Sequence, residues 1–283
     1  MQRYKIVHRT YYNYSDEVML GPHKLLLRPR EDHELRIESF NLNISPNAKL
    51  LWHRDVEGNS VAQATFDQST SQLLIDSEVV IQQYNEAPLN FMVAAHALGY
   101  PFVYQAEDLN LLQPYMALHD YEAEAAVKNW IENFWPVGEA IQTYTLLQRM
   151  TEHIFNSMQY KVREEPGVQS AQHTLSCGNG SCRDFAQLFI ESARCLGLAS
   201  RFVSGYLFAP LMSDMVGATH AWAEVYLPGA GWKGFDPTIG KIVGSDHIPV
   251  AVSSRAESVP PIGGSYAGAG KSTLDVGVWV SKC

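Results

Sequence analysis

Hydrophobic and polar positions alternate with a period of two along the first 85 residues, which is the pattern of half-buried β-strands. Residues 4–12 show it most clearly, because aromatic and β-branched side chains dominate one face of the run. Turn-forming residues separate this run from the further alternating runs 23–28, 35–44, 49–54, 60–66 and 72–82. Several short strands with turns between them predict an N-terminal β-sandwich domain of the immunoglobulin-like kind over residues 1–86.

The pattern changes to a helical period further along the chain. Residues 87–118 carry three prolines and no sustained period, so we interpret them as a connecting segment. Helical periodicity is present over 121–135, 143–158 and 182–196. Strand patterns return over 199–208, 220–227 and 232–236, and the alternation of 274–280 predicts a last strand. These elements predict an α+β fold in which residues 119–283 form a second, catalytic domain.

Composition and charge limit the classes of function. The 283 residues are 46% hydrophobic and 18% charged, and the formal net charge is -9. This acidic balance argues against nucleic acid or an anionic membrane as a partner. No apolar stretch approaches the length of a membrane span, and the N-terminal residues do not form a signal peptide pattern. The sequence therefore predicts a cytoplasmic protein with no membrane partner, and leaves a homo-oligomer open.

The four cysteines do not form a disulfide framework, and there is no CxxC pair. Cys182 follows a Gly-Ser turn and begins a helical pattern, where unpaired backbone amides and the helix dipole favour a thiolate. Cys195 lies on the apolar side of that helix and is expected to be a small buried hydrophobe, and Cys283 is expected to be exposed. Cys177 could form a redox switch with Cys182. We predict no metal site, since no second ligand pair follows at zinc spacing.

Two later strands supply residues that could work with Cys182. His220 begins the run 220–227, and Asp236 ends the run 232–236. The intervening Pro-Gly-Ala-Gly segment predicts a hairpin, which brings His220 and Asp236 to the same end of the sheet. The two side chains share a face only if the loop has an odd number of residues, either 228–230 or 227–231. The hypothesis of a shared site therefore predicts an odd register.

A cysteine, a histidine and an aspartate arranged in this way can act as nucleophile, general base and orienting group. The backbone amide of Cys182 could then donate to the oxyanion of a tetrahedral intermediate. A second donor could come from Tyr160, His173 or Asn179. Trp222 would cover the thiolate or line the channel for the acyl group. Taken singly, each of these residues is more often structural, and an Asp before Pro-Thr commonly forms a turn, so the prediction rests on their combination.

The motifs together resemble those of the bacterial transglutaminase-like superfamily. The matching segments are GSCRDFA at 180–186, HAWAEVYLPGAGWKGFDPT at 220–238, HRTYY at 8–12 and LRPR at 27–30. The resemblance continues downstream through His247 and Ile248 and through residues 260–266. It implies a papain-like core in which a Cys helix packs on an antiparallel sheet, with Cys182, His220 and Asp236 as the triad and no cofactor.

The resemblance and the residues lead to one functional prediction. We expect a transglutaminase-like cysteine protease, acting as a hydrolase or an acyltransferase on a peptide, protein or small amide through a Cys182 thioester. The alternative is a non-catalytic binding or scaffolding member of the same fold. Two segments depart from related sequences: Arg183 stands where Gln is frequent, and residues 254–257 replace a Gly-Arg-Asp-Tyr motif. A change of substrate preference would follow if residues 254–257 lined the cleft.

Overall fold

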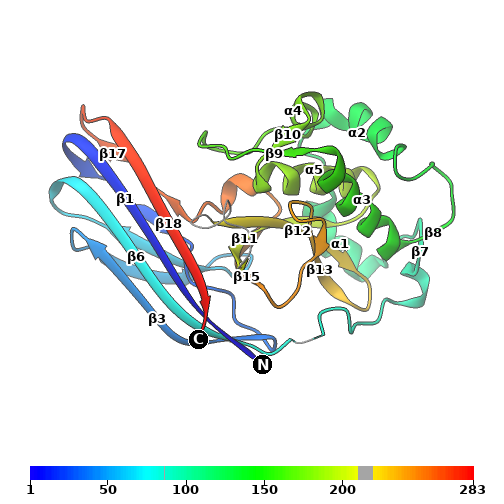
Figure 1. Ribbon diagram of the computed structural model, residues 1–283, viewed down its shortest axis with the longest axis horizontal. Coiled ribbons are helices and arrows are strands. Elements are labelled where there is room, and N and C mark those ends of the chain that lie inside the picture. The colour runs from blue at the N-terminus through cyan, green and yellow to red at the C-terminus, as the bar shows by residue number, and fades with distance from the viewer. Residues whose placement is uncertain (86, 210–218) are drawn as a thin grey trace.

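The computed structural model describes residues 1–85, 87–209 and 219–283. A β-sheet with long strands lies on one side of the molecule, and a second sheet with helices packed against it lies on the other (Figure 1). The larger N-terminal sheet has the order β17-β1-β6-β3, and β18 also pairs with β1. Its strands are β1 (Gln2–Leu20), β3 (Leu35–Ser45), β6 (Ser69–Gln83), β17 (Tyr266–Ala267) and β18 (Ser272–Lys282).

A smaller sheet of order β16-β2-β5-β4 packs against the larger one. Its strands are β2 (His23–Leu25), β4 (Lys49–Arg54), β5 (Ser60–Thr65) and β16 (Ile262–Gly263). Alternate side chains of both sheets fill the space between them, as the period of two predicts. The buried members of this core are Tyr14, Val18, Leu20, Leu25, Leu27, Ala62, Ala64, Leu73 and Ile75. The prediction of packed antiparallel sheets is therefore correct, whereas an immunoglobulin-like sandwich is not confirmed.

The C-terminal strand lies in the N-terminal half of the molecule, contrary to the prediction that 119–283 form one domain. β18 runs antiparallel to β1 from Tyr4↔Lys282 to Tyr14↔Ser272, so the two ends of the chain are neighbours (Figure 1). The alternation of residues 274–280 identified a strand, but alternation does not say which sheet a strand joins. β18 joins this sheet because β1 has 19 residues, and without β18 much of one edge of β1 would have no strand to pair with.

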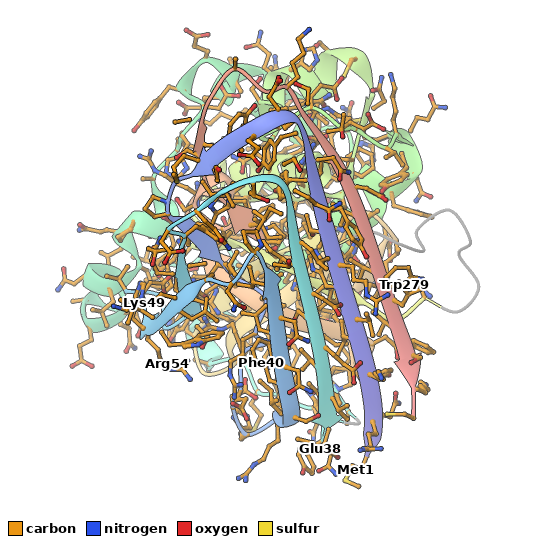
Figure 2. The ribbon with its side chains drawn as sticks, turned by 90° about the vertical axis from the view of Figure 1, so that its left-hand side faces the viewer. Met1, Glu38, Phe40, Lys49, Arg54 and Trp279 are labelled. Atoms are coloured by element: carbon orange, nitrogen blue, oxygen red, sulfur yellow. The ribbon has the colours of Figure 1, made fainter. Side chains whose placement is uncertain are left out.

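Figure 2 shows the outer face of the larger sheet, on which polar and charged side chains point to solvent. Opposite charges face each other across its strands: Arg3 pairs with Glu38 at 2.6 Å, Lys5 with Glu78 at 2.9 Å and Arg9 with Asp76 at 2.9 Å. Such exposed pairs contribute little to stability. Their main effect is to keep the face hydrated, so the inner face of the sheet supplies the packing.

The inner face of β1 contacts two different partners along its length. Near its C-terminal end it packs on the smaller sheet, and near its N-terminal end it packs on the sheet formed within residues 200–253 in the other half of the molecule. The second contact buries Tyr4, Ile6, Leu35, Val79, Ile81, Val278, Tyr206, Ile248 and Val250. The N-terminal module is therefore held against the sheet that carries the candidate site, rather than attached by a flexible linker.

His8 lies inside this contact and gives it a dependence on pH. Its Nδ1 is 3.0 Å from the Tyr206 hydroxyl, and its Nε2 is 3.1 Å from Oγ1 of Thr10. Burial lowers the pKa of His8 to about 4, whereas an unfolded histidine has a pKa of about 6.5. The unfolded chain therefore takes up the proton first, and the stability contributed by neutral His8 is present above pH 6.5 and lost as the pH falls towards 4.

We expect the free energy of unfolding of the wild type to fall by about 2–3 kcal/mol more than that of His8→Gln between pH 7 and pH 4.5. Urea unfolding at the two pH values measures the difference. Glutamine retains a polar side chain at this position but does not titrate, so it serves as the matched variant. Equal losses in the two proteins would contradict a titrating role for His8.

The other half of the molecule contains a five-stranded sheet of order β14-β13-β12-β11-β15. Its strands are β11 (Ser200–Leu207), β12 (His220–Leu227), β13 (Gly231–Asp236), β14 (Lys241–Ile242) and β15 (His247–Ser253). The helices are α1 (Ala106–Met116), α2 (Glu124–Ile131), α3 (Thr143–Ser157), α4 (Ala171–Cys177) and α5 (Cys182–Cys195). Short pairs join β7 (Gly99–Tyr100) to β8 (Ile141–Gln142) and β9 (Gln159–Tyr160) to β10 (Asn179–Gly180). Among the described residues, no helix is long and apolar enough to cross a membrane.

Helix α5 lies at the centre of the core of this half. It packs against Ala221, Ala223 and Val225 on one face of β12, and Phe189 stacks on Phe235 of β13 at 5.4 Å. This burial explains the hydrophobic stripe seen in the sequence. Helix α1 was missed within the predicted connecting segment, because only Leu112 of its residues is buried and Pro114 lies inside it.

Candidate active site

The start of α5 is fixed by a buried carboxylate. Asp184 is fully buried and accepts hydrogen bonds from the Ser181 amide at 2.8 Å, the Ser181 hydroxyl at 2.7 Å, Arg163 at 2.7 Å and the Gln169 amide at 2.7 Å. Burial alone would raise the pKa of this carboxyl, but these donors hold it below its usual range. The capping box therefore places Cys182 on the first residue of the helix, where its own amide has no helical partner.

The predicted odd register of the β12–β13 hairpin is confirmed. Leu227 faces Gly231 and Glu224 faces Gly234, so three residues, 228–230, form the loop. This register puts His220 and Asp236 on the same face of the sheet, because side chains alternate along each strand. Nε2 of His220 lies 2.6 Å from Oδ2 of Asp236, and both side chains are buried.

Asp236 is held by more than His220. The Thr238 amide donates to its Oδ1 at 2.9 Å, and Nε2 of His247 lies 3.0 Å from the same Oδ2 that contacts His220. His247 is the first residue of β15 and is 4% exposed. His247 is not among the site residues that the sequence predicts. The only signal was its position in the segment that extends the family resemblance.

The charges in this group are set by their contacts. Burial opposes a charged His220, but Asp236 and then Cys182 outweigh it and raise the pKa of His220 to about 10. Burial likewise opposes an ionised Asp236, but His220 and His247 hold the pKa of this carboxyl well below its usual range. Both shifts favour a protonated His220 beside an ionised Asp236. Since Asp236 occupies Nε2 of His220, the other ring nitrogen, Nδ1, is left for Cys182; Nδ1 has no hydrogen-bond partner among the described residues.

Of the predicted oxyanion donors, Tyr160 is the one that the structure brings to Cys182. β9 lies parallel to β10, which leads directly into α5. Burial, and then the charge of Cys182, raise the pKa of Tyr160 to about 12, so its hydroxyl keeps its proton and remains a donor. His173 lies on the exposed surface of α4, and the amide of Asn179 donates to the Cys177 carbonyl at 2.9 Å.

Trp222 does not lie over the thiol, which corrects the prediction. It is fully buried in a cluster with Val203 and Val252, separate from the cluster that contacts Cys182. Its ring meets that of His247 edge-on at 5.2 Å and lies 6.1 Å from that of His220. The physical reason is that Trp222 lies two residues further into β12 than His220, where their shared face continues into the core formed with Val203 and Val252. Trp222 therefore supports the two histidines from behind.

A cavity of about 620 Å³ lies beside the strand pair that leads to Cys182. Arg183 shapes its wall, because its Nη2 donates to the carbonyls of Arg163 and Glu165. Arg183 is thus a clamp on the loop that precedes α4. The lining residues are Lys161, Val162, Arg163, Glu164, Glu165, Gln169, His173, Cys177 and Asn179. Two predicted site residues, His173 and Asn179, therefore belong to this cavity rather than to the thiol.

Cys283 matches its prediction, whereas Cys195 is less buried than predicted. Cys195 is half-buried, burial raises its pKa to about 11, and Cys283 is exposed. Cys177 is a free thiol whose Sγ donates to the Asn179 carbonyl at 3.3 Å. A redox exchange between Cys177 and Cys182 stays a prediction.

The segment 254–257 does not reach the candidate site. The Ser254 carbonyl accepts a hydrogen bond from Arg194 at 2.6 Å, and Arg194 lies in the last turn of α5. Cys182 begins this 14-residue helix, so the two ends are about 20 Å apart. The departure from the family motif in this segment therefore does not line the cleft near Cys182.

His220, Asp236 and His247 also form a group that could hold a metal ion, since their donor atoms lie within 4.8 Å of one another. The Gly244 amide donates to Nδ1 of His247 at 3.2 Å. Nδ1 is therefore the acceptor, and the ring proton sits on Nε2, which donates to Asp236. A metal on Nε2 would force that proton to Nδ1, against the Gly244 N–H. The arrangement fits a hydrogen-bonded carboxylate better than a metal centre.

Comparisons with known proteins agree with this geometry. Residues 4–82 match the family described as the bacterial transglutaminase-like N-terminal region, and residues 136–237 match the transglutaminase-like superfamily. The second match contains Cys182, His220 and Asp236. An uncharacterized protein of Mycobacterium tuberculosis (strain ATCC 25618 / H37Rv) is 31% identical, over 98% of this chain and 91% of its own. The chain therefore belongs to the bacterial transglutaminase-like superfamily.

Two further relatives extend the comparison. An uncharacterized protein of Mycobacterium leprae is 26% identical over 100% of this chain and 99% of its own. A solved structure from Cytophaga hutchinsonii, described provisionally as a cysteine protease, has a TM-score of 0.77 and 18% identity, covering 99% of this chain and 90% of its own. At this identity the likeness shows the fold, and it spans both halves of the molecule.

Proposed function

We propose that this protein is a cysteine-dependent amide hydrolase or acyltransferase that works through a thioester on Cys182. The observation that carries the proposal is the state of His220. It is buried, its Nε2 is bound to an ionised carboxylate, its Nδ1 is left for the thiol, and its pKa is raised to about 10. A histidine in this state can hold the proton of Cys182 at neutral pH, which leaves a thiolate.

The proposed reaction has two stages. The thiolate attacks the carbonyl carbon of an amide, and the Cys182 backbone amide and the Tyr160 hydroxyl stabilise the oxyanion. His220 then gives its proton to the leaving amine, and a thioester remains on Cys182. Water or a second amine loses a proton to His220 and attacks the thioester, which restores the free thiol. Hydrolysis and acyl transfer share every step up to the second nucleophile.

Alkylation by iodoacetamide at pH 6 is the test of this proposal. We expect Cys182 of the wild type to react much faster than an ordinary cysteine, which is less than about 1% thiolate at this pH. Labelling should be lost in Cys182→Ala and should slow by at least about tenfold in His220→Ala. Cys195→Ala provides a matched control on the same helix, and its labelling should equal that of the wild type.

Labelling that is unchanged in Cys182→Ala and His220→Ala would refute the mechanism and favour a binding or scaffolding member of the fold. The substrate class is then found by a screen of peptides, glutamine-type side-chain amides and small amides. Each donor is offered with and without an added amine, and Cys182→Ala serves as the blank. Product that appears only with the amine identifies an acyltransferase, and product in water alone identifies a hydrolase.

A further inference from the structure

His247 occupies a position that the general Cys-His-Asp arrangement does not require. Its Nε2 lies 3.0 Å from Oδ2 of Asp236, the oxygen that also accepts from His220 at 2.6 Å. Three groups therefore contact the Asp236 carboxylate. Besides His220, these are the Thr238 amide on Oδ1 and His247 on Oδ2. The Thr238 amide and His220 hold one carboxylate oxygen each, and His247 adds a second donor on Oδ2.

The tautomer of His247 is fixed by the backbone. The Gly244 amide donates to its Nδ1 at 3.2 Å, so the proton is on Nε2 and points at Asp236. Trp222 packs edge-on against the ring at 5.2 Å and holds its plane. His247 is also 4% exposed, so water does not compete with this contact. The Gly244 amide and Trp222 thus orient the ring towards one carboxylate oxygen.

We propose that His247 is a positioning residue that locks the Asp236 carboxylate against His220 and so maintains the reactive form of Cys182. This inference rests on the proposed function, because it assigns a second residue to the same site. His247 does not touch Cys182 and transfers no proton. It donates one hydrogen bond to an anion, and such hydrogen bonds are among the stronger ones in proteins.

The charged surroundings do not offer Asp236 an equivalent donor. On the side of the site, His220 on β12 and Tyr160 on β9 interact with the carboxylate, and Cys182 on α5 interacts with His220 and Tyr160. A second cavity, of about 410 Å³, lies behind the sheet and includes His247 in its wall. Its Arg201 already pairs with Glu224 at 2.7 Å. The titratable residues around that cavity are Arg30, Asp32, His33, Glu34, Arg201, Glu224, Lys233 and His247.

Two substitutions separate the two contacts of the ring. His247→Gln can place an N–H donor near the position of Nε2 and so keep the bond to Asp236. In His247→Asn the shorter side chain extends only to the position of Nδ1. Its oxygen keeps an acceptor for the Gly244 amide, and the donor to Asp236 is lost. A positioning role requires the donor to Asp236, and a role confined to the loop at Gly244 requires the acceptor.

The experiment measures the rate of Cys182 alkylation by iodoacetamide from pH 4 to pH 9 in the full-length wild type and both variants. We expect His247→Gln to stay within about threefold of the wild type and His247→Asn to react roughly tenfold more slowly at pH 6. The acid limb of the profile should move to higher pH in His247→Asn alone. Circular dichroism and thermal melting establish that each variant is folded.

The His220–Asp236 contact is followed independently by proton NMR, since a ring N–H that donates to a carboxylate gives a strongly downfield resonance. We expect this resonance in the wild type and His247→Gln, and its loss or displacement in His247→Asn. Retention in His247→Asn with loss in His247→Gln, or equal behaviour of both variants, would overturn the inference. A wild type that alkylates like a free thiol but shows the expected NMR pattern would overturn the proposed function and leave the positioning role supported.

Discussion

Replacing Asp236 by asparagine is expected to slow the alkylation of Cys182 at pH 6 by about 10²-fold, towards the rate of an ordinary thiol. The reason is the set of donors around this side chain. Oδ2 accepts from Nε2 of both His220 and His247, and Oδ1 accepts from the Thr238 amide. An asparagine has one oxygen and one NH2 group. At least one of the three N–H donors must therefore face the NH2 group, which is itself a donor.

Neither orientation of the asparagine preserves the site. With the oxygen towards the histidines, the NH2 group opposes the Thr238 N–H. With the NH2 group towards the histidines, His220 must move its proton to Nδ1, and in that tautomer it cannot accept the proton of Cys182. His247 cannot adapt in the same way, because its Nδ1 already accepts from Gly244.

The pH dependence provides the internal control for Asp236→Asn. At pH 9 an ordinary cysteine is largely ionised, so the difference from the wild type should shrink to less than about tenfold. A folded variant that is slow at pH 6 and recovers at pH 9 has lost the thiolate rather than the structure. Reaction within threefold of the wild type at pH 6 would contradict an orienting role for Asp236.

The sequence predicted the parts of this site that depend on local pattern. A small-residue turn before a helical stripe placed Cys182 at a helix start, and the capping box formed by Ser181 and Asp184 explains why. The alternation of 220–227 and the Pro-Gly-Ala-Gly turn predicted the hairpin, and the requirement that His220 and Asp236 share a face fixed its register. Each of these inferences involves residues at most 16 positions apart on one helix or one hairpin.

The parts that were missed depend on contacts between distant segments. His247 reaches Asp236 because β15 pairs with β11, and β11 in turn pairs with β12, which no periodicity encodes. The same reason explains β18, whose alternation was recognised but whose partner, β1, lies at the other end of the chain. Trp222 shares a face of β12 with His220, which favours a position near the thiol. In the structure that face continues into a separate core, and Trp222 lies there.

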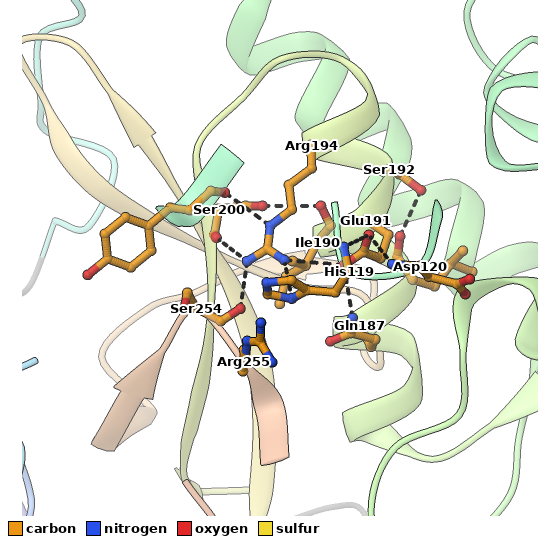
Figure 3. Close-up of polar contacts among 12 residues, drawn as sticks. His119, Asp120, Gln187, Ile190, Glu191, Ser192, Arg194, Ser200, Ser254 and Arg255 are labelled. Carbon is orange, nitrogen blue, oxygen red and sulfur yellow. Dashed lines mark hydrogen bonds and ion pairs between the residues drawn. The ribbon is translucent and has the colours of Figure 1, made fainter. Parts of the chain in front are cut away.

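The far end of α5 is held by a buried ion pair that the sequence also did not reveal (Figure 3). Arg194 contacts Glu191 at 3.2 Å and His119 at 2.9 Å, and both charged side chains are almost fully buried. The same guanidinium donates to three backbone carbonyls, those of Tyr115, Ser200 and Ser254. One side chain thus joins α5 to the segment before α2, to the start of β11 and to the segment after β15.

Arg194→Met is therefore expected to lower the free energy of unfolding by about 3–5 kcal/mol, because Glu191 is left as a buried charge without its partner. Glu191 keeps only the Gln187 side chain and the amides of His119 and Asp120 as donors. Glu191→Gln combined with Arg194→Met removes that charge and should recover about 1–3 kcal/mol of the loss. Urea unfolding at pH 7 measures both variants.

The same variants separate the stability of α5 from the chemistry at its start. Because Arg194 is at the opposite end of the helix from Cys182, alkylation at pH 6 of the folded Arg194→Met protein should remain within about twofold of the wild type. A loss of stability below about 1 kcal/mol, or a double variant no more stable than the single one, would contradict a stabilising ion pair between Arg194 and Glu191. The expected combination, a much less stable protein with an unchanged thiol, would assign the ion pair to the architecture that carries the site and not to the site itself.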